Sequence, residues 1–161
     1  MNIFKIADRF FKAEMKLANI VKVNVFIKPE ESEEPVKNAF LRLFPFSLEE
    51  EKIFFRKSKA KGFNQREIIV YEADLIKGRH INEFLEFLNS KFDEQQKKML
   101  VLQENRLDDN LDFFIRLDKQ CLANNSYNIT DCGDCFHIRI SIAAFPRKRE
   151  AALEVVKRIF S

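Results

Sequence analysis

The segment LDFFIRLDKQ at residues 111–120 decides the predicted fold. Apolar residues alternate along it with polar or aromatic ones, and this two-residue period is typical of a half-buried β-strand. One face of the strand is apolar and is predicted to belong to a core. The other face carries an aromatic ring and a guanidinium, Phe114 and Arg116, and a charged turn with Lys119 and Gln120 is predicted to follow at once.

A second stretch with the same alternation runs over residues 136–145. Apolar residues face one way, and Arg139 lies on the opposite, outward side. The stretch is followed by the basic run Arg147-Lys148-Arg149 at a predicted helix start. If the two strands lie in one sheet, Arg116 and Arg139 share its exposed surface.

The remaining patterns predict three more strands and several helices, each helix with one apolar stripe. The strands are predicted at residues 21–27, 52–61 and 66–75, and the helices at 2–17, 33–44, 80–92, 93–107 and 150–160. Ser32 is the predicted cap of the second helix, and the strand at 66–75, apolar on both sides, is predicted to be central. Strands in pairs with helices between them indicate an α+β fold. We predict a mostly antiparallel sheet of about five strands with helices packed on one face.

Length and composition limit the classes of protein that fit this chain. Its 161 residues suit one domain, which we place at residues 20–161 after an N-terminal helical extension at residues 1–19. Lys and Arg outnumber Asp and Glu by 28 to 25, so a polyanion must be held by a local basic patch. No apolar run approaches the length of about 18 residues that spans a bilayer, and no signal peptide is evident, so we expect a cytoplasmic protein without membrane contact.

Basic residues interleaved with aromatic ones on strands are typical of sheets that bind nucleic acids. Such sheets stack unpaired bases on exposed rings and hold phosphates with Arg and Lys. The rings predicted to stack are Phe26, Phe114 and Phe145, and the cations predicted to meet phosphates are Lys22, Arg116, Lys119 and Arg139. Alternatively, the rings form a second small core under a helix and the charges form a solvated rim.

Two basic tracts add to this pattern. The strand at 52–61 is predicted to fray into the tract Arg56-Lys57-Ser58-Lys59-Ala60-Lys61, which suits a phosphate backbone or, alternatively, is a solvent-exposed loop. The run Arg147-Lys148-Arg149 places cations at a helix start, where they disfavour the isolated helix. That local conflict indicates a functional role, since phosphate binds at helix N-termini.

Three cysteines fit a reducing compartment better than a disulfide framework. Cys132-Gly133-Asp134-Cys135, with Cys121 and His137 nearby, is compatible with a zinc site, a redox pair or a turn with small buried thiols. The absence of a second C-x-x-C pair favours the turn. No sequence motif of an enzyme occurs, so we predict no catalytic residue, cofactor or metal site. Only the acids clustered near residues 108–118 leave a metal-dependent nuclease as an alternative.

The segments FFIRLDKQ at 113–120 and HIRISIAAFPRKREAALEV at 137–155 together resemble an archaeal family of small, predicted RNA-binding proteins. That family is associated with the exosome and was long classed as a domain of unknown function. The segment VNVFIKPEESEE at 23–34 fits the same pattern. The resemblance implies RNA binding and a fold similar to that of the large-subunit ribosomal protein that binds 5S rRNA. The motif positions it carries over are Arg116, Asp118, Lys119, Gln120, Arg139, Pro146, Lys148, Arg149 and Glu150.

We therefore predict a non-catalytic protein that binds a structured or ribosomal RNA and is associated with RNA processing or the exosome. The alternative is a protein-interaction adaptor in an RNA-processing or ribosomal assembly, which docks through exposed phenylalanines. The residues predicted to bind RNA are Arg56, Lys57, Lys59, Lys61, Phe114, Arg116, Lys119, Gln120, Arg139, Arg147, Lys148 and Arg149.

Overall fold

A computed structural model describes residue 3 and residues 15–161 of the chain. The predicted helix at residues 2–17 lies almost entirely outside the described residues. The chain divides into two compact units. Unit 1 contains the described residues of Met1–Val21 with Ile76–Phe113 and Ile140–Ser161, and unit 2 contains Lys22–Leu75 and Phe114–Arg139. Neither unit is a continuous stretch of chain. The predicted division into an extension at 1–19 and a domain at 20–161 stays a prediction.

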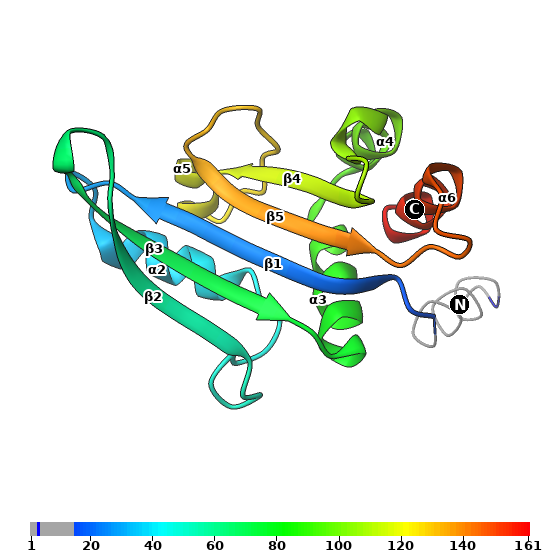
Figure 1. Cartoon of the computed structure of the whole chain (residues 1–161), viewed down its shortest axis with the longest axis horizontal. Coiled ribbons are helices and arrows are strands. Elements are labelled where there is room, and N and C mark those ends of the chain that lie inside the picture. The colour runs from blue at the N-terminus through cyan, green and yellow to red at the C-terminus, as the bar shows by residue number, and fades with distance from the viewer. Residues whose placement is uncertain (1–2, 4–14) are drawn as a thin grey trace. The chain divides into compact units, whose positions relative to one another are not determined.

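Five strands form one sheet in the order β2-β3-β1-β5-β4. They are β1 (Ala18–Ile27), β2 (Phe54–Lys61), β3 (Glu67–Leu75), β4 (Asp112–Asp118) and β5 (Cys135–Ile142). Neighbouring strands run antiparallel, as the arrows of β3, β1, β5 and β4 show in Figure 1 and as the pairing of β2 with β3 shows directly. The predicted α+β class with an antiparallel sheet is confirmed. The middle strand is β1, whereas β3, predicted to be central, is an inner strand beside the edge strand β2.

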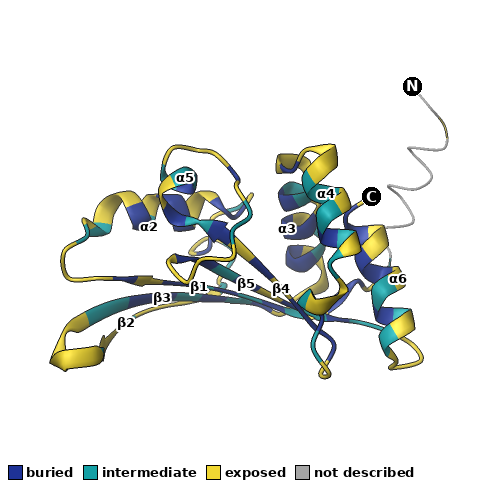
Figure 2. Ribbon diagram, turned by 90° about the horizontal axis from the view of Figure 1, so that it is seen from above, coloured by how far each residue is buried: buried dark blue, intermediate teal, exposed yellow. Residues whose placement is uncertain are grey.

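In unit 2, helices α2 (Glu33–Arg42) and α5 (Lys119–Ala123) lie on the same face of the strands (Figure 2). The strands turn their apolar residues toward these helices. For example, Val23, Val25 and Ile27 are buried on β1, and Phe40 is buried on α2. Ser32 precedes α2 as predicted, but its side chain makes no capping hydrogen bond. The other face of these strands is covered by no helix among the described residues.

The β2–β3 hairpin is more regular than the sequence predicted. The basic tract does not fray, because β2 stays paired with β3 as far as Lys61, which lies opposite Glu67. A short 3-10 turn, Phe63–Gln65, closes the hairpin. A Cβ atom on Gly62 would lie 2.3 Å from Cδ1 of Ile68, so a larger residue there would force the Ile68 side chain to shift. The hairpin therefore presents its cations from an ordered strand.

In unit 1, helices α3 (Gly78–Lys91) and α6 (Arg149–Ile159) each bury an apolar stripe, whereas α4 (Glu94–Leu102) buries only Leu100. α4 begins with a capping box between Asp93 and Gln96 and ends five residues before the predicted limit of 107, followed by the 3-10 turn Glu104–Arg106. Within the described part of the chain, no helix has the length and apolarity needed to cross a membrane.

Candidate nucleic-acid interface

The uncovered face of unit 2 is formed along three neighbouring strands, β1, β5 and β4. On β4, Ile115 and Leu117 are buried while Phe114 and Arg116 are exposed. On β5, Arg139 is exposed in the same alternating manner. We call this surface the open face. Its aromatic and basic members are Lys22, Phe26, Phe114, Arg116, His137 and Arg139.

Two large apolar side chains remain in contact with solvent on the open face. Phe26 is 47% exposed and Phe114 is 39% exposed. The rings of Phe26 and His137 meet edge to face, with centroids 6.1 Å apart and an interplanar angle of 82°. Within residues 15–161, neither Phe26 nor Phe114 is enclosed under a helix, which favours the exposed-ring interpretation for these two residues.

Electrostatics around His137 leave a neutral imidazole beside a guanidinium. Burial lowers the pKa of His137, and the positive charge of Arg116 lowers it further. Arg116 itself donates a hydrogen bond from Nη1 to the Asp131 carbonyl oxygen at 3.2 Å. Cys135 Sγ lies 3.6 Å from His137 Nε2, and burial raises the pKa of this thiol. The pair is thus uncharged at neutral pH, unlike an activated cysteine nucleophile.

Cations on the β1–β3–β2 side of the sheet face carboxylates. Arg56 on β2 hydrogen-bonds to Glu72 on β3, and Lys22 on β1 lies 3.7 Å from Asp74. Both carboxylates therefore reduce the positive potential on that side. Arg116 and Arg139 lie on the β5–β4 side instead.

The predicted basic hairpin is largely neutralised by carboxylates. Lys57 pairs with Glu33 at 2.6 Å, and Lys59 pairs with Glu67 at 3.4 Å. Hydrogen bonds from Lys57 and then from Tyr71 hold the pKa of Glu33 below its ordinary value. Lys61 makes no ion pair within the described part of the chain. These exposed pairs are weak and can exchange with phosphates, so the hairpin remains a secondary candidate.

Lys119 is buried, contrary to the expectation of an exposed charged turn. The turn is helix α5, capped by Asp118, whose carboxylate accepts a hydrogen bond from the Cys121 amide at 2.8 Å. The side chain of Lys119 is only 5% exposed. Gln120, the next residue, is exposed. Lys119 is therefore placed to hold the fold together, whereas Gln120 is accessible to a ligand.

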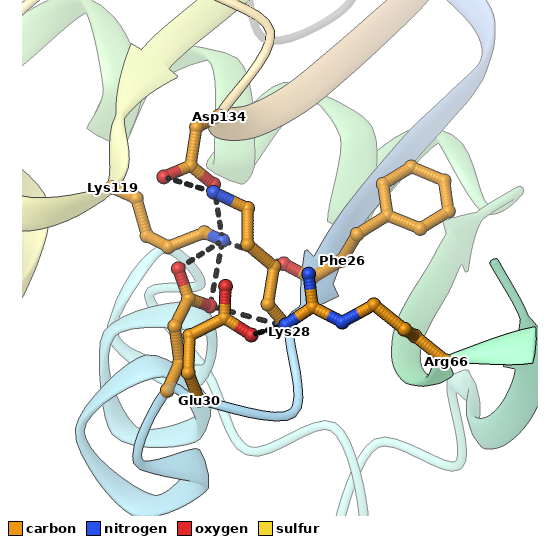
Figure 3. A network of polar contacts seen from close by, with 7 residues as sticks. Phe26, Lys28, Glu30, Arg66, Lys119 and Asp134 are labelled. Atoms are coloured by element: carbon orange, nitrogen blue, oxygen red, sulfur yellow. Dashed lines mark hydrogen bonds and ion pairs between the residues drawn. The ribbon is translucent and has the colours of Figure 1, made fainter. Parts of the chain in front are cut away.

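The Lys119 ammonium sits in a dense polar network (Figure 3). It donates to the Phe26 carbonyl oxygen at 2.6 Å, to Asp134 at 2.6 Å and to Glu31 at 3.0 Å. Lys28 lies 3.4 Å from the same Asp134 carboxylate. Neither Glu31 nor Asp134 was predicted as a partner, and no sequence signal could have found them. They are 88 and 15 positions from Lys119.

This network predicts a pH-dependent stability. Burial raises the pKa of Asp134, but Lys119 and then Lys28 outweigh that effect and leave the pKa below its ordinary value. Ionised Asp134 therefore stabilises the fold above about pH 4, and this contribution is lost as the pH falls through its folded-state pKa. We expect the difference in unfolding free energy between wild type and Asp134→Asn to be largest near pH 7 and to shrink toward pH 2.

Urea denaturation at a series of pH values measures that difference. Asp109→Asn is the matched control, because Asp109 is exposed and forms no ion pair among the described residues. A difference for Asp134→Asn that stays constant from pH 7 to pH 2 contradicts the prediction.

The second basic run, Arg147-Lys148-Arg149, lies in unit 1, and its residues have two different roles. Arg147 and Lys148 are exposed, and the neighbouring ring of Phe145 is 99% exposed. Arg149, by contrast, donates to the carbonyl oxygens of Leu107 at 2.9 Å and Glu104 at 2.7 Å. Arg149 thus anchors the start of α6 to the segment after α4, which accounts for a cation at this helix start.

The cysteines are spread over different environments. Cys135 is buried, Cys121 is half-buried and Cys132 is exposed, and all three are free thiols. Asn128 donates a hydrogen bond to Sγ of Cys121 at 3.2 Å. Among the described residues, no group of three or more His, Cys, Asp and Glu side chains is arranged to hold a metal ion.

Comparisons with known proteins show which family the chain resembles. A family model described as RNA binding matches residues 20–142. The RNA-binding protein PAB1135 of Pyrococcus abyssi (strain GE5 / Orsay) is 30% identical over 141 residues, which cover 87% of this chain and 92% of that protein.

Solved structures of archaeal proteins share the fold. Protein AF2318 from Archaeglobus fulgidus matches with a TM-score of 0.77 and 28% identity, covering 88% of this chain and 99% of that chain. Mth689 from Methanothermobacter thermautotrophicus matches with a TM-score of 0.72 and 27% identity, covering 90% of this chain and 99% of that chain. Both are DUF54 proteins. From the family match and the similarity to PAB1135 together, the chain belongs to this family of RNA-binding proteins.

Proposed function

We propose that the protein binds RNA without cleaving or modifying it, and that the open face of unit 2 is the contact surface. The observation that carries the proposal is the exposure of Arg116 and Arg139 on adjacent strands, on a face that also exposes Phe26 and Phe114. Solvent-exposed rings contribute little to the stability of the fold. In a binding surface, however, such rings can stack on bases while neighbouring guanidinium groups bind phosphates.

The low net charge of the chain means that local contacts must hold the RNA. The chain carries a formal net charge of only +3, so long-range attraction to RNA is weak and local contacts must supply the affinity. Arg offers a planar fork of donors that matches two phosphate oxygens at once. Arg116 and Arg139 occupy the side of the sheet away from Glu72 and Asp74.

Other predicted residues have secondary roles in this proposal. Gln120 and Lys61 are exposed in unit 2, and Arg147 and Lys148 are exposed in unit 1, so each is available to a phosphate. Lys119 and Arg149 are excluded from direct contact because their donors are engaged inside the fold. Lys57 and Lys59 would have to exchange a carboxylate for a phosphate.

Filter binding of a labelled RNA across a KCl series tests the proposal. We expect Arg116→Gln to weaken binding about tenfold at low salt, since a hydrogen bond to a charged group contributes about 1.5 kcal/mol. The slope of log K against log salt should fall by about 0.7 to 0.9 for each phosphate that the variant no longer neutralises. Arg139→Gln should act in the same direction.

Arg56→Gln is the matched control. Arg56 is an exposed arginine on a strand of the same unit, but it already hydrogen-bonds to Glu72. Its replacement should therefore weaken binding less than Arg116→Gln does, since a phosphate would first have to displace Glu72. Unchanged affinity and unchanged salt slope for both Arg116→Gln and Arg139→Gln would show that RNA does not bind at the open face.

The cellular setting belongs to the proposal as well. We propose that the RNA is structured or ribosomal and that the protein acts in RNA processing, in association with the exosome. Similarity to the ribosomal protein that binds 5S rRNA stays a prediction.

The exposed rings of Phe26 and Phe114 also favour a second candidate, an adaptor that docks on protein. Pull-downs with and without ribonuclease separate the two, because an adaptor keeps its partners after RNA is destroyed. Incubation of labelled RNA with the protein and Mg²⁺ or Mn²⁺ tests whether the protein cleaves RNA.

A further inference from the structure

We infer that the open face recognises an unpaired nucleotide, whose base stacks on the ring of Phe26 beside His137 and Arg116. The inference rests on the proposed function and specifies the class of RNA: a single strand, loop or bulge, as opposed to a continuous double helix. It follows from three features of Phe26: its exposure, its fixed backbone and its neighbours.

The ring of Phe26 is held in place while nearly half of its surface stays exposed. His137 contacts it edge to face from the adjacent strand β5. The backbone carbonyl of the same residue accepts a 2.6 Å hydrogen bond from buried Lys119. In Figure 3 the ring points away from the ammonium and carboxylate groups of that network. A ring fixed in this way loses little conformational entropy when a base stacks on it.

The groups around Phe26 match the parts of one nucleotide. A phenyl ring offers a face to any base. The imidazole of His137, kept neutral by burial and by Arg116, has one donor and one acceptor nitrogen for a base edge. The Arg116 guanidinium is exposed and supplies the charge for the phosphate. Lys119 is a positioning residue here, because it touches the backbone of Phe26 and lies inside the fold.

A double helix cannot use this arrangement. In A-form RNA the faces of the bases are stacked on one another, and proteins reach mainly phosphates and 2′-hydroxyl groups. A half-exposed phenyl ring gains nothing from such contacts, whereas a base that is free to unstack can cover it. The composition of the open face, with rings between cations, therefore favours unpaired nucleotides.

The experiment compares a fluorescein-labelled single-stranded RNA with the duplex of the same sequence by anisotropy, using the full chain. We expect wild type to bind the single strand more tightly than the duplex. Phe26→Ala should weaken single-strand binding about 5- to 100-fold, the range expected when one base no longer stacks on an aromatic ring, and should leave the salt slope unchanged. Phe26→Tyr should retain binding because it keeps the ring face.

Phe63→Ala is the matched control. Phe63 is exposed at the tip of the β2–β3 hairpin, away from β5 and β4, and its replacement should change the affinity less than twofold. A measurement that needs no variant is photo-crosslinking of wild type to RNA carrying 5-iodouridine. The crosslink should map to the peptide that contains Phe26.

The outcomes separate the two proposals. Equal or tighter binding of the duplex, an unchanged affinity for folded Phe26→Ala, or crosslinks confined to other peptides overturns the inference of base stacking. If Arg116→Gln still weakens binding in that case, RNA binding at the open face stands. If wild type binds neither RNA at low salt, the proposed function itself fails.

Discussion

Replacing Lys119 by methionine is expected to lower the free energy of unfolding by about 3 kcal/mol, the lower end of the range for removing one partner of a buried ion pair. Methionine keeps the apolar stem but deletes the ammonium that bridges Glu31, Asp134 and the Phe26 carbonyl. The two carboxylates would then lose their shared counter-charge, and the carbonyl would lose its donor. The lower end applies because Asp134 is partly exposed and water can screen it.

Urea denaturation followed by circular dichroism measures this change. Lys28→Met is the matched control, since Lys28 contacts the same Asp134 carboxylate at 3.4 Å but is itself 47% exposed. Its replacement should cost less than about 0.5 kcal/mol, as is usual for surface ion pairs. Equal effects of the two substitutions would mean that burial does not distinguish these lysines.

Replacing Phe40 by alanine is expected to destabilise the protein by about 4 kcal/mol, since truncation of a buried phenylalanine leaves a cavity. Phe40 on α2 is fully buried, and its ring lies 5.5 Å from that of Phe44, 5.8 Å from Phe55 and 6.0 Å from Tyr71, centroid to centroid. Through these rings, α2 is attached to both strands of the β2–β3 hairpin. The substitution should therefore loosen the hairpin as well as lower global stability.

Thermal and urea unfolding measure the stability, and amide hydrogen exchange in β2 and β3 measures the local loosening. Phe54→Ala is the control for the same chemical change at a half-exposed site, where the ring centroid lies 5.9 Å from the Arg56 guanidinium carbon. It should cost about 1 kcal/mol or less. A cost for Phe40→Ala no greater than that for Phe54→Ala would contradict the role of the Phe40 cluster.

The strand faces could be predicted because alternation is a local property. Val23, Val25 and Ile27 are buried as their spacing indicates, and Arg116 and Arg139 are exposed for the same reason. Element ends were less predictable. β5 stops at Ile142 instead of residue 145, and α4 stops at Leu102, because the ends of an element depend on packing and hydrogen bonds beyond it.

The basic residues show where local reasoning ends. Lys119 and Arg116 look alike in the sequence, two cations three positions apart in one motif. Their surroundings differ, since the ammonium of Lys119 is enclosed by Glu31 and Asp134 while Arg116 stays exposed. Likewise, the hairpin cations appeared free in the sequence, but Lys57 meets Glu33 from another element.

The sequence by itself determined the α+β class, the antiparallel strands and the side of β1, β4 and β5 that meets water, because side-chain period and apolar content act within a few residues. Only the tertiary structure decided which cations stay exposed to solvent and which are enclosed by carboxylates. That depends on carboxylates brought close by chain folding, and Coulomb attraction acts through distance in space, which separation along the chain does not reveal.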